Sequence, residues 1–104
     1  MCLILFAVQP NEKLRLVIAA NRDELYDRPA SSAGYWQDSP EVLGGRDLQM
    51  GGTWLGISKQ GRFAAVTNFR ETPADPLPPR SRGELTSKFL TTDLAARDYL
   101  EDIR

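Results

Sequence analysis

Cys2 has the clearest capacity for chemistry in this sequence, because it directly follows Met1. Removal of Met1 would leave Cys2 with a thiol and a free α-amine, whose ordinary pKa of about 7.7–8.0 allows it to act as a general base near neutral pH. Nucleophile and base would then belong to one residue. With Met1 retained Cys2 carries no free amine, so we expect little or no hydrolase activity in that form. The alternative is that Cys2 is a small hydrophobic residue at the start of a buried strand.

The run Asn21-Arg22-Asp23-Glu24 provides the second group of candidate site residues. A guanidinium from Arg22 near the thiol would favour the thiolate, and the Asp23 carboxylate could accept a hydrogen bond from the α-amine and orient that base. We assign Asn21 and Glu24 to substrate binding. The alternative for the run is a local network of charged side chains that caps the end of a hairpin.

Asn68 and Trp54 complete the candidate set. The side-chain amide of Asn68, at the end of a predicted strand, could donate a hydrogen bond to an oxyanion near the thiol. Its alternative is a turn asparagine that bonds its own backbone. We assign Trp54 to substrate binding, and the alternative is a core residue.

Histidine is absent from the 104 residues. Its absence excludes Ser-His-Asp and Cys-His mechanisms within this chain, and also most zinc sites. We therefore predict no metal site and no cofactor from the residues themselves. The single cysteine cannot form an internal disulfide, which fits a reducing compartment, and we expect a cytoplasmic protein.

Two apolar runs at residues 2–8 and 14–20 flank a short polar turn and predict an antiparallel hairpin. The first run is apolar throughout, so we expect its strand to be buried on both faces. The second run leads directly into residues 21–24. Because the end of the second strand of a hairpin lies beside the start of the first, residues 21–24 can reach Cys2.

The middle of the chain, residues 25–50, is rich in Pro, Ser, Gly and Asp and predicts a long, largely irregular segment. We interpret the glycine pairs at 44–45 and 51–52 as turns, because they lack the context of phosphate-binding loops. A second hairpin is predicted from strands at 54–58 and 62–68.

The last third of the chain predicts helices. Four prolines make residues 73–79 a stiff connector. Ser81 and Glu84 fit a capping box, with Leu85, Phe89 and Leu90 as the apolar stripe of the helix that follows. A second helix is predicted from Thr92 to the end of the chain, with its apolar positions at Ala96, Tyr99, Leu100 and Ile103.

Two hairpins followed by helices indicate an α+β fold with an antiparallel sheet, in a single domain over residues 1–104. Such a sheet leaves edges and one face uncovered, so we expect more chain, a homodimer through the exposed sheet, or another partner to cover it.

The net charge of the chain limits the classes of partner that it can bind. With 13 basic and 14 acidic residues the net charge is −1, which gives no field that would collect nucleic acid. No apolar segment is long enough to span a bilayer. A small-molecule substrate or ligand is the expected partner.

Several motifs together resemble the NRDE family, the Transport and Golgi organization 2-like proteins. The family is named after the tetrad found here at residues 21–24. The other matching segments, in order, are Met1-Cys2, Arg28-Pro29, Gly51-Gly52-Thr53-Trp54-Leu55-Gly56, Thr67-Asn68-Phe69-Arg70 and Ser81-Arg82-Gly83. An ordered set of this kind is specific, and it covers nearly the whole chain.

That family in turn resembles the N-terminal-nucleophile hydrolases of the choloylglycine hydrolase and penicillin acylase type. The resemblance implies that this chain is the N-terminal half of a four-layer αββα sandwich, and that later residues complete the site. It implies Cys2 as nucleophile, Arg22 and Asp23 beside the thiol and amine, and Asn68 as oxyanion donor, in an enzyme that cleaves small amide or acyl substrates.

The resemblance also implies two other functions. One is a non-catalytic carrier of a hydrophobic small molecule, such as haem or a lipid or acyl group, in trafficking or Golgi and secretory organisation. Haem would need Cys2, a Met or a Tyr as its axial ligand. The other is an interaction module that presents its uncovered sheet to a partner.

Overall fold

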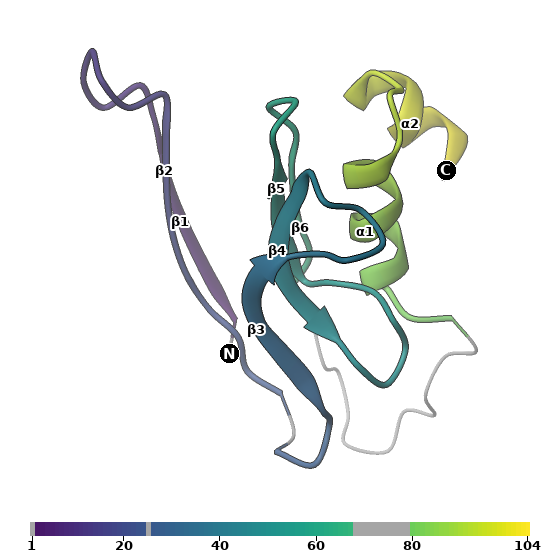
Figure 1. Ribbon diagram of the computed structural model, residues 1–104. Helices are drawn as coiled ribbons and strands as arrows, with labels where there is room; N and C mark the ends of the chain where they lie inside the picture. Colours follow the sequence, from purple (N-terminus) through teal and green to yellow (C-terminus); the bar gives the residue numbers. More distant parts are fainter. Residues whose placement is uncertain (1, 25, 68–79) are drawn as a thin grey trace.

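The computed structural model describes residues 2–24, 26–67 and 80–104. It contains a two-stranded sheet, a four-stranded sheet and two helices (Figure 1). The elements, in chain order, are β1 Leu3–Val8, β2 Leu16–Asn21, β3 Ala30–Tyr35, β4 Val42–Asp47, β5 Leu55–Ser58, β6 Phe63–Ala65, α1 Gly83–Thr91 and α2 Ala96–Asp102. Both sheets are antiparallel, so the predicted α+β class is confirmed.

The predicted N-terminal hairpin is confirmed as β1–β2. Leu3 pairs with Asn21 and Val8 with Leu16, so the start of β1 lies beside the end of β2. In the connecting turn the Asn11 side chain accepts hydrogen bonds from the backbone N–H groups of Lys13 and Leu14. Asparagine stabilises turns in this way, because its side chain takes the place of a backbone acceptor.

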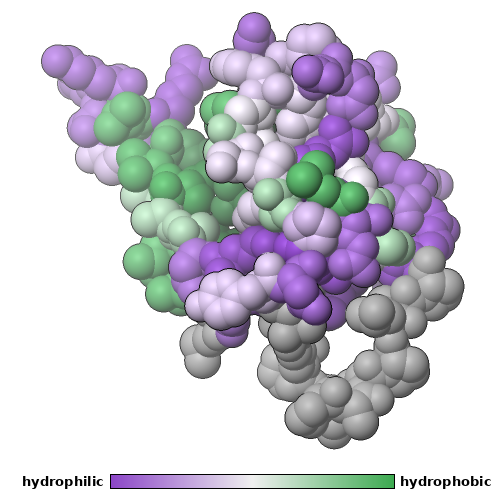
Figure 2. Space-filling model, turned by 60° about the horizontal axis from the view of Figure 1, so that its bottom comes forward, coloured by the Kyte–Doolittle hydropathy of each residue, from purple (hydrophilic) through white to green (hydrophobic). Residues whose placement is uncertain are grey.

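The prediction that the first strand is buried on both faces is wrong for the described chain. Leu5 is 59% exposed, Phe6 66% and Val8 71%. Figure 1 shows the reason: the tip of the hairpin stands apart from the four-stranded sheet, and no described element lies over its outer face. Figure 2 shows hydrophobic surface gathered over this hairpin.

The prediction of an irregular segment over residues 25–50 is also wrong, because β3 and β4 form a hairpin there. Gly44 and Gly45 belong to β4 and are not a turn. A Cβ at Gly44 would lie 2.8 Å from the carbonyl oxygen of Leu55, and one at Gly45 would collide with the Trp54 ring. Glycine is required at these two positions because neighbouring groups approach the strand closely. Strand propensities are based on local sequence and cannot predict such contacts.

The second predicted hairpin is confirmed as β5–β6, and it extends the sheet in the order β3-β4-β5-β6. Its strands are shorter than the predicted 54–58 and 62–68. Helix α1 packs on β4, β5 and β6, where Leu90 meets Gly56. Leu90, Trp36 and Val42 form the buried core, with Ala64 packed against it.

Helix α1 begins differently from the predicted capping box. Arg82 is the N-cap and makes no side-chain cap bond. The Ser81 hydroxyl accepts a hydrogen bond from the Gly83 N–H at 3.2 Å. The Glu84 carboxylate pairs with Arg80 at 2.6 Å and Lys88 at 2.8 Å instead of turning back to Ser81. Two nearby cations therefore outcompete the backbone N–H for this carboxylate.

The second helix occupies Ala96–Asp102, so its predicted start at Thr92 and its predicted end at Arg104 are both wrong. Thr92 has extended backbone angles, φ −98° and ψ 164°, and ends α1. Within the predicted apolar stripe only Tyr99 is buried, and its hydroxyl donates to the Leu85 carbonyl at 2.6 Å. Arg62 also ties this region to β6, donating to the Phe89 and Leu94 carbonyls. The predicted proline connector at 73–79 lies outside the described residues.

Candidate functional site

A pocket of about 370 Å³ lies where the base of the β1–β2 hairpin faces β5 and the start of α1. Its lining combines apolar side chains from the hairpin and β5 with a group of charged ones. The apolar members include Ile4, Ile18, Leu55 and Val66, and the charged members are Arg22, Glu24, Arg28, Asp47 and Arg82. Pockets of this size, mostly apolar with a few placed polar groups, are typical of small-molecule sites.

Cys2 lies in the wall of this pocket. Its Sγ accepts a hydrogen bond from the backbone N–H of Asp23 at 3.3 Å, and its thiol lies 3.8 Å from the Asp23 carbonyl oxygen. The hairpin register produces these contacts. Leu3 pairs with Asn21, so Cys2, just before Leu3, lies close to Asp23, shortly after Asn21. Both contacts fix the position of Sγ relative to the backbone of Asp23.

The Asn21 side chain stabilises the same junction between the start of β1 and the end of β2. Its Oδ1 accepts the backbone N–H of Leu3 at 3.0 Å, and the residue lines the pocket. This bond holds the first residue of β1 against the end of β2. It gives Asn21 a positioning role in addition to the predicted contact with substrate.

Arg22 stacks on Trp54, with its guanidinium carbon 4.2 Å from the ring centroid. Both residues line the pocket, so the two predictions meet at one place. Within the described residues no hydrogen bond joins Arg22 to Cys2. Cation–π stacking holds Arg22 instead.

Arg28 and Asp47 form an ion pair that sequence analysis did not single out. Arg28 Nη2 lies 2.6 Å from Asp47 Oδ2, and the two side chains are 19% and 7% exposed. Arg28 Nη1 also lies 3.9 Å from Glu24 Oε2. The pair therefore connects the segment after β2 to the end of β4. An Arg-Pro dipeptide soon after the tetrad was the available signal, but its partner lies 19 residues away.

The titration of this pair follows from its surroundings. Burial alone raises the pKa of the Asp47 carboxyl, but hydrogen bonds from Arg28 and the Gln49 backbone and the Arg28 charge outweigh burial and hold the pKa below its ordinary value. The hydrogen bond to Asp47 raises the pKa of Arg28. Both groups are therefore charged at neutral pH.

Two of the motifs that match the NRDE family, at residues 51–56 and 81–83, meet in the wall of the pocket. Thr53 N–H donates to the Gly83 carbonyl at 3.3 Å, and the Thr53 hydroxyl donates to the Gly45 carbonyl at 2.8 Å. A Cβ at Gly52 would lie 2.5 Å from the carbonyl carbon of Gly83. Gly52 and Gly83 are therefore needed for close backbone contact, whereas Gly51 has nothing within 4 Å and instead takes a positive φ of 82°. Arg82, beside Gly83, lines the pocket.

The predicted oxyanion donor Asn68 lies outside the described residues. The described residues that precede it, Val66 and Thr67, both line the pocket. Among the described residues, no cluster of three or more His, Cys, Asp and Glu side chains is placed to hold a metal ion. No helix in the described part of the chain is both long and apolar enough to cross a membrane.

Comparison with known proteins gives consistent matches over this whole region. The sequence profile of the family described as Transport and Golgi organisation 2 matches residues 1–104. The chain is 43% identical over 110 residues to the mouse Transport and Golgi organization 2 homolog and 44% identical to the human one, and covers 99% of its own length in each. It is 33% identical over 99 residues to the Drosophila melanogaster Transport and Golgi organization protein 2.

The chain spans 40% of the length of the mouse and human relatives. The family profile nevertheless covers every residue from Met1 to Arg104, including Cys2 and the tetrad at 21–24. This chain belongs to the Transport and Golgi organisation 2 family.

Proposed function

We propose that this chain carries the nucleophile of a cysteine-dependent hydrolase of the N-terminal-nucleophile type, acting on small amide or acyl substrates. The observation that supports it best is the environment of Cys2. Its Sγ faces a pocket of about 370 Å³ and accepts the Asp23 N–H at 3.3 Å. A thiol that is both accessible to a ligand and supplied with a donor is suited to act as a nucleophile.

The reaction begins once Met1 has been removed. The α-amine of Cys2 accepts the thiol proton, and Sγ attacks the substrate carbonyl carbon. The C–N bond of the amide breaks, the amine leaves with that proton, and a thioester remains on Sγ. Water, deprotonated by the same α-amine, then cleaves the thioester and releases the carboxylic acid and the free thiol. Each step uses the one base that a chain without histidine can supply beside the nucleophile.

In this proposal the residues around Cys2 have distinct tasks. Asn21 holds the start of β1 through the Leu3 N–H, and the backbone N–H of Asp23 donates to Sγ and holds it in place. Arg22 and Trp54 form the charged and aromatic wall of the substrate pocket. No cofactor enters the reaction, because nucleophile and base both come from Cys2.

The second candidate is a carrier of a hydrophobic small molecule, in keeping with relatives whose names refer to transport and Golgi organization. It is favoured by the apolar part of the lining, which continues into the exposed hairpin. Of the side chains that can ligate haem iron, Cys2 and Met50 line the pocket. Carriage requires binding without turnover, so catalysis separates the two candidates.

The test is to express the full chain, confirm removal of Met1 by mass spectrometry, and assay a panel of amides and thioesters. Cys2→Ala is expected to abolish turnover, and Cys2→Ser to reduce it by a factor of about a hundred or more, because an alcohol is a much weaker nucleophile than a thiolate. A variant that retains Met1 is the matched control and should be inactive. If wild type and Cys2→Ala turn over equally, the hydrolase proposal is wrong, and unchanged binding of acyl ligands or haem in Cys2→Ala favours the carrier.

A further inference from the structure

The charges around the pocket differ from those of the chain as a whole. The chain carries a net charge of −1, whereas the described lining of the pocket has three arginines against two carboxylates and no lysine. The arginines are Arg22, Arg28 and Arg82. A concave surface with a surplus of positive charge attracts anions.

Only one of these arginines is neutralised by a short contact. Arg28 lies 2.6 Å from Asp47 and also faces Glu24 at 3.9 Å. Arg22 lies 4.0 Å from Glu24, which is beyond hydrogen-bond distance. The carboxylate closest to Arg82 in the sequence, Glu84, is paired with Arg80 and Lys88. Within the described residues, the guanidinium of Arg22 has only the long ion pair to Glu24 and that of Arg82 has none, and neither forms a hydrogen bond.

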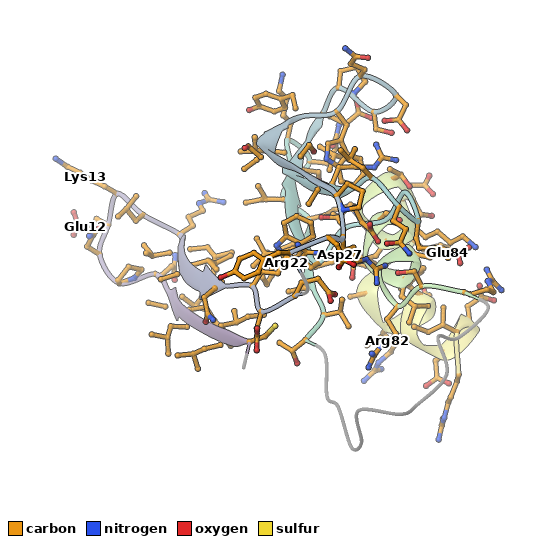
Figure 3. All side chains as sticks on the ribbon, turned by 90° about the horizontal axis from the view of Figure 1, so that it is seen from below. Glu12, Lys13, Arg22, Asp27, Arg82 and Glu84 are labelled. Carbon is orange, nitrogen blue, oxygen red and sulfur yellow. The ribbon has the colours of Figure 1, made fainter. Side chains whose placement is uncertain are left out.

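Arg22 is also held in place before any ligand arrives. Its side chain is 23% exposed and its guanidinium stacks on Trp54 at 4.2 Å. Stacking occupies the face of a guanidinium and leaves the N–H groups at its edge directed outward. An ordered arginine in a pocket wall, whose donors form no hydrogen bond to the described residues, is suited to bind a carboxylate or phosphate. Figure 3 shows Arg22 on the hairpin side and Arg82 on the helix side of this region.

We propose that the ligand of this pocket carries an anionic oxygen group, recognised by Arg22 from the hairpin side and by Arg82 from the start of α1. The apolar part of the ligand lies against Ile4, Ile18, Leu55 and Val66, in the same pocket that Cys2 lines. The inference deepens the proposed function by naming the charge of the substrate. It depends on the same pocket, but not on turnover or on removal of Met1.

The test uses Cys2 as a reporter, since it is the single cysteine of the chain. The full chain is alkylated with iodoacetate, which is anionic, and with iodoacetamide, a neutral reagent of nearly the same size. Both reagents form the same bond from Sγ to carbon and release iodide. The ratio of their rates therefore cancels changes in thiolate content and in exposure of the thiol, and reports the charge of the pocket.

We expect Arg22→Gln and Arg82→Gln each to lower the iodoacetate-to-iodoacetamide rate ratio by about three- to tenfold at low salt, the range for one charge at short distance in a partly aqueous site. Arg97→Gln is the control, because Arg97 is an exposed arginine outside the pocket, and it should leave the ratio unchanged. Raising the salt to 1 M should lower the ratio of the wild type toward that of the variants.

Protection of Cys2 from iodoacetamide then identifies the anion. Hexanoate and hexyl phosphate should each protect the thiol more than hexanamide, and the stronger of the two gives the class of headgroup. The proposal is overturned if the iodoacetate-to-iodoacetamide rate ratio is insensitive to salt and unchanged in Arg82→Gln. This test holds even if Arg22→Gln does not fold, because the Arg82 side chain makes no described contact that the substitution would remove. A wild type with no hydrolase activity but a charge-dependent ratio refutes the proposed function alone.

Discussion

At the scale of single residues, the site depends on contacts between side chains and backbone. Cys2 is positioned by the Asp23 N–H, and Asn21 by the Leu3 N–H. The types of these residues suggested a nucleophile with polar neighbours. The stacking of Arg22 on Trp54 was not foreseen, because the two residues are far apart in the sequence and no pattern joins them.

Asp47→Asn is expected to destabilise the fold by about 2–3 kcal/mol at pH 7, slightly below the range for fully buried pairs, because it leaves the half-buried Arg28 with only the longer ion pair to Glu24. The pKa of Asp47 is lowered in the folded state. Its stabilisation is therefore complete above the ordinary value of 3.8 and is lost as the pH falls below that value.

Urea unfolding of wild type and Asp47→Asn between pH 7 and pH 2.5 measures this effect. The two stabilities should differ at pH 7 and approach one another in acid. Asp38→Asn is a useful comparison, since Asp38 also pairs with an arginine but is 64% exposed, and it should destabilise the fold clearly less than Asp47→Asn does. A constant difference across the pH range would contradict the assigned role of Asp47.

At the scale of elements, two of the hairpins were predictable and one was not. Alternating or continuous apolar residues bounded by turn formers indicated β1–β2 and β5–β6. Serine and glycine concealed β3–β4, since these residues have low strand propensity. Gly44 and Gly45 are in β4 because of what packs on them, and packing is not visible in local sequence.

Gly44→Ala is expected to destabilise the four-stranded sheet by about 1–3 kcal/mol, because its Cβ would lie 2.8 Å from the Leu55 carbonyl oxygen and neither backbone can move freely. Gly34→Ala, in the neighbouring strand β3, is the matched control. Nothing lies within 4 Å of the Cβ it adds, so its stability should stay within about 0.5 kcal/mol of wild type. Thermal unfolding followed by circular dichroism compares the two, and equal melting temperatures would refute the packing account of Gly44.

At the scale of the whole molecule, the described chain has one covered sheet and one uncovered one. Helix α1 covers β4, β5 and β6, whereas β1 and β2 form an isolated pair of strands. A two-stranded sheet with large exposed apolar side chains is only marginally stable in water. The continuous apolar run of the first strand indicated burial that the described chain alone does not provide.

We expect the chain by itself to self-associate through the β1–β2 hairpin. Phe6→Ser should therefore lower the association constant measured by sedimentation equilibrium by about tenfold or more, since Phe6 is 66% exposed on β1. Leu100→Ser is the control, because Leu100 is 62% exposed but lies on α2. A chain that stays monomeric at every concentration, or equal effects of the two substitutions, would refute the expected homodimer.

The sequence by itself determined the candidate nucleophile, the class of fold and the family. Cys2 before a strand, a tetrad at the end of the next strand, and the absence of histidine are local or compositional facts, so they need no coordinates. Antiparallel pairing then brings Cys2 to the tetrad, because hairpin geometry is set by neighbouring residues.

Only the tertiary structure decided which groups form the pocket around Cys2. The pairing of Arg28 with Asp47, the stacking of Arg22 on Trp54 and the arrival of Arg82 from the start of α1 join segments that are distant in the sequence. Such contacts depend on how the hairpin, the sheet and the helix pack together, and that packing is a property of the whole fold. The surplus of positive charge among the described residues of the pocket is therefore invisible in a chain with a net charge of −1.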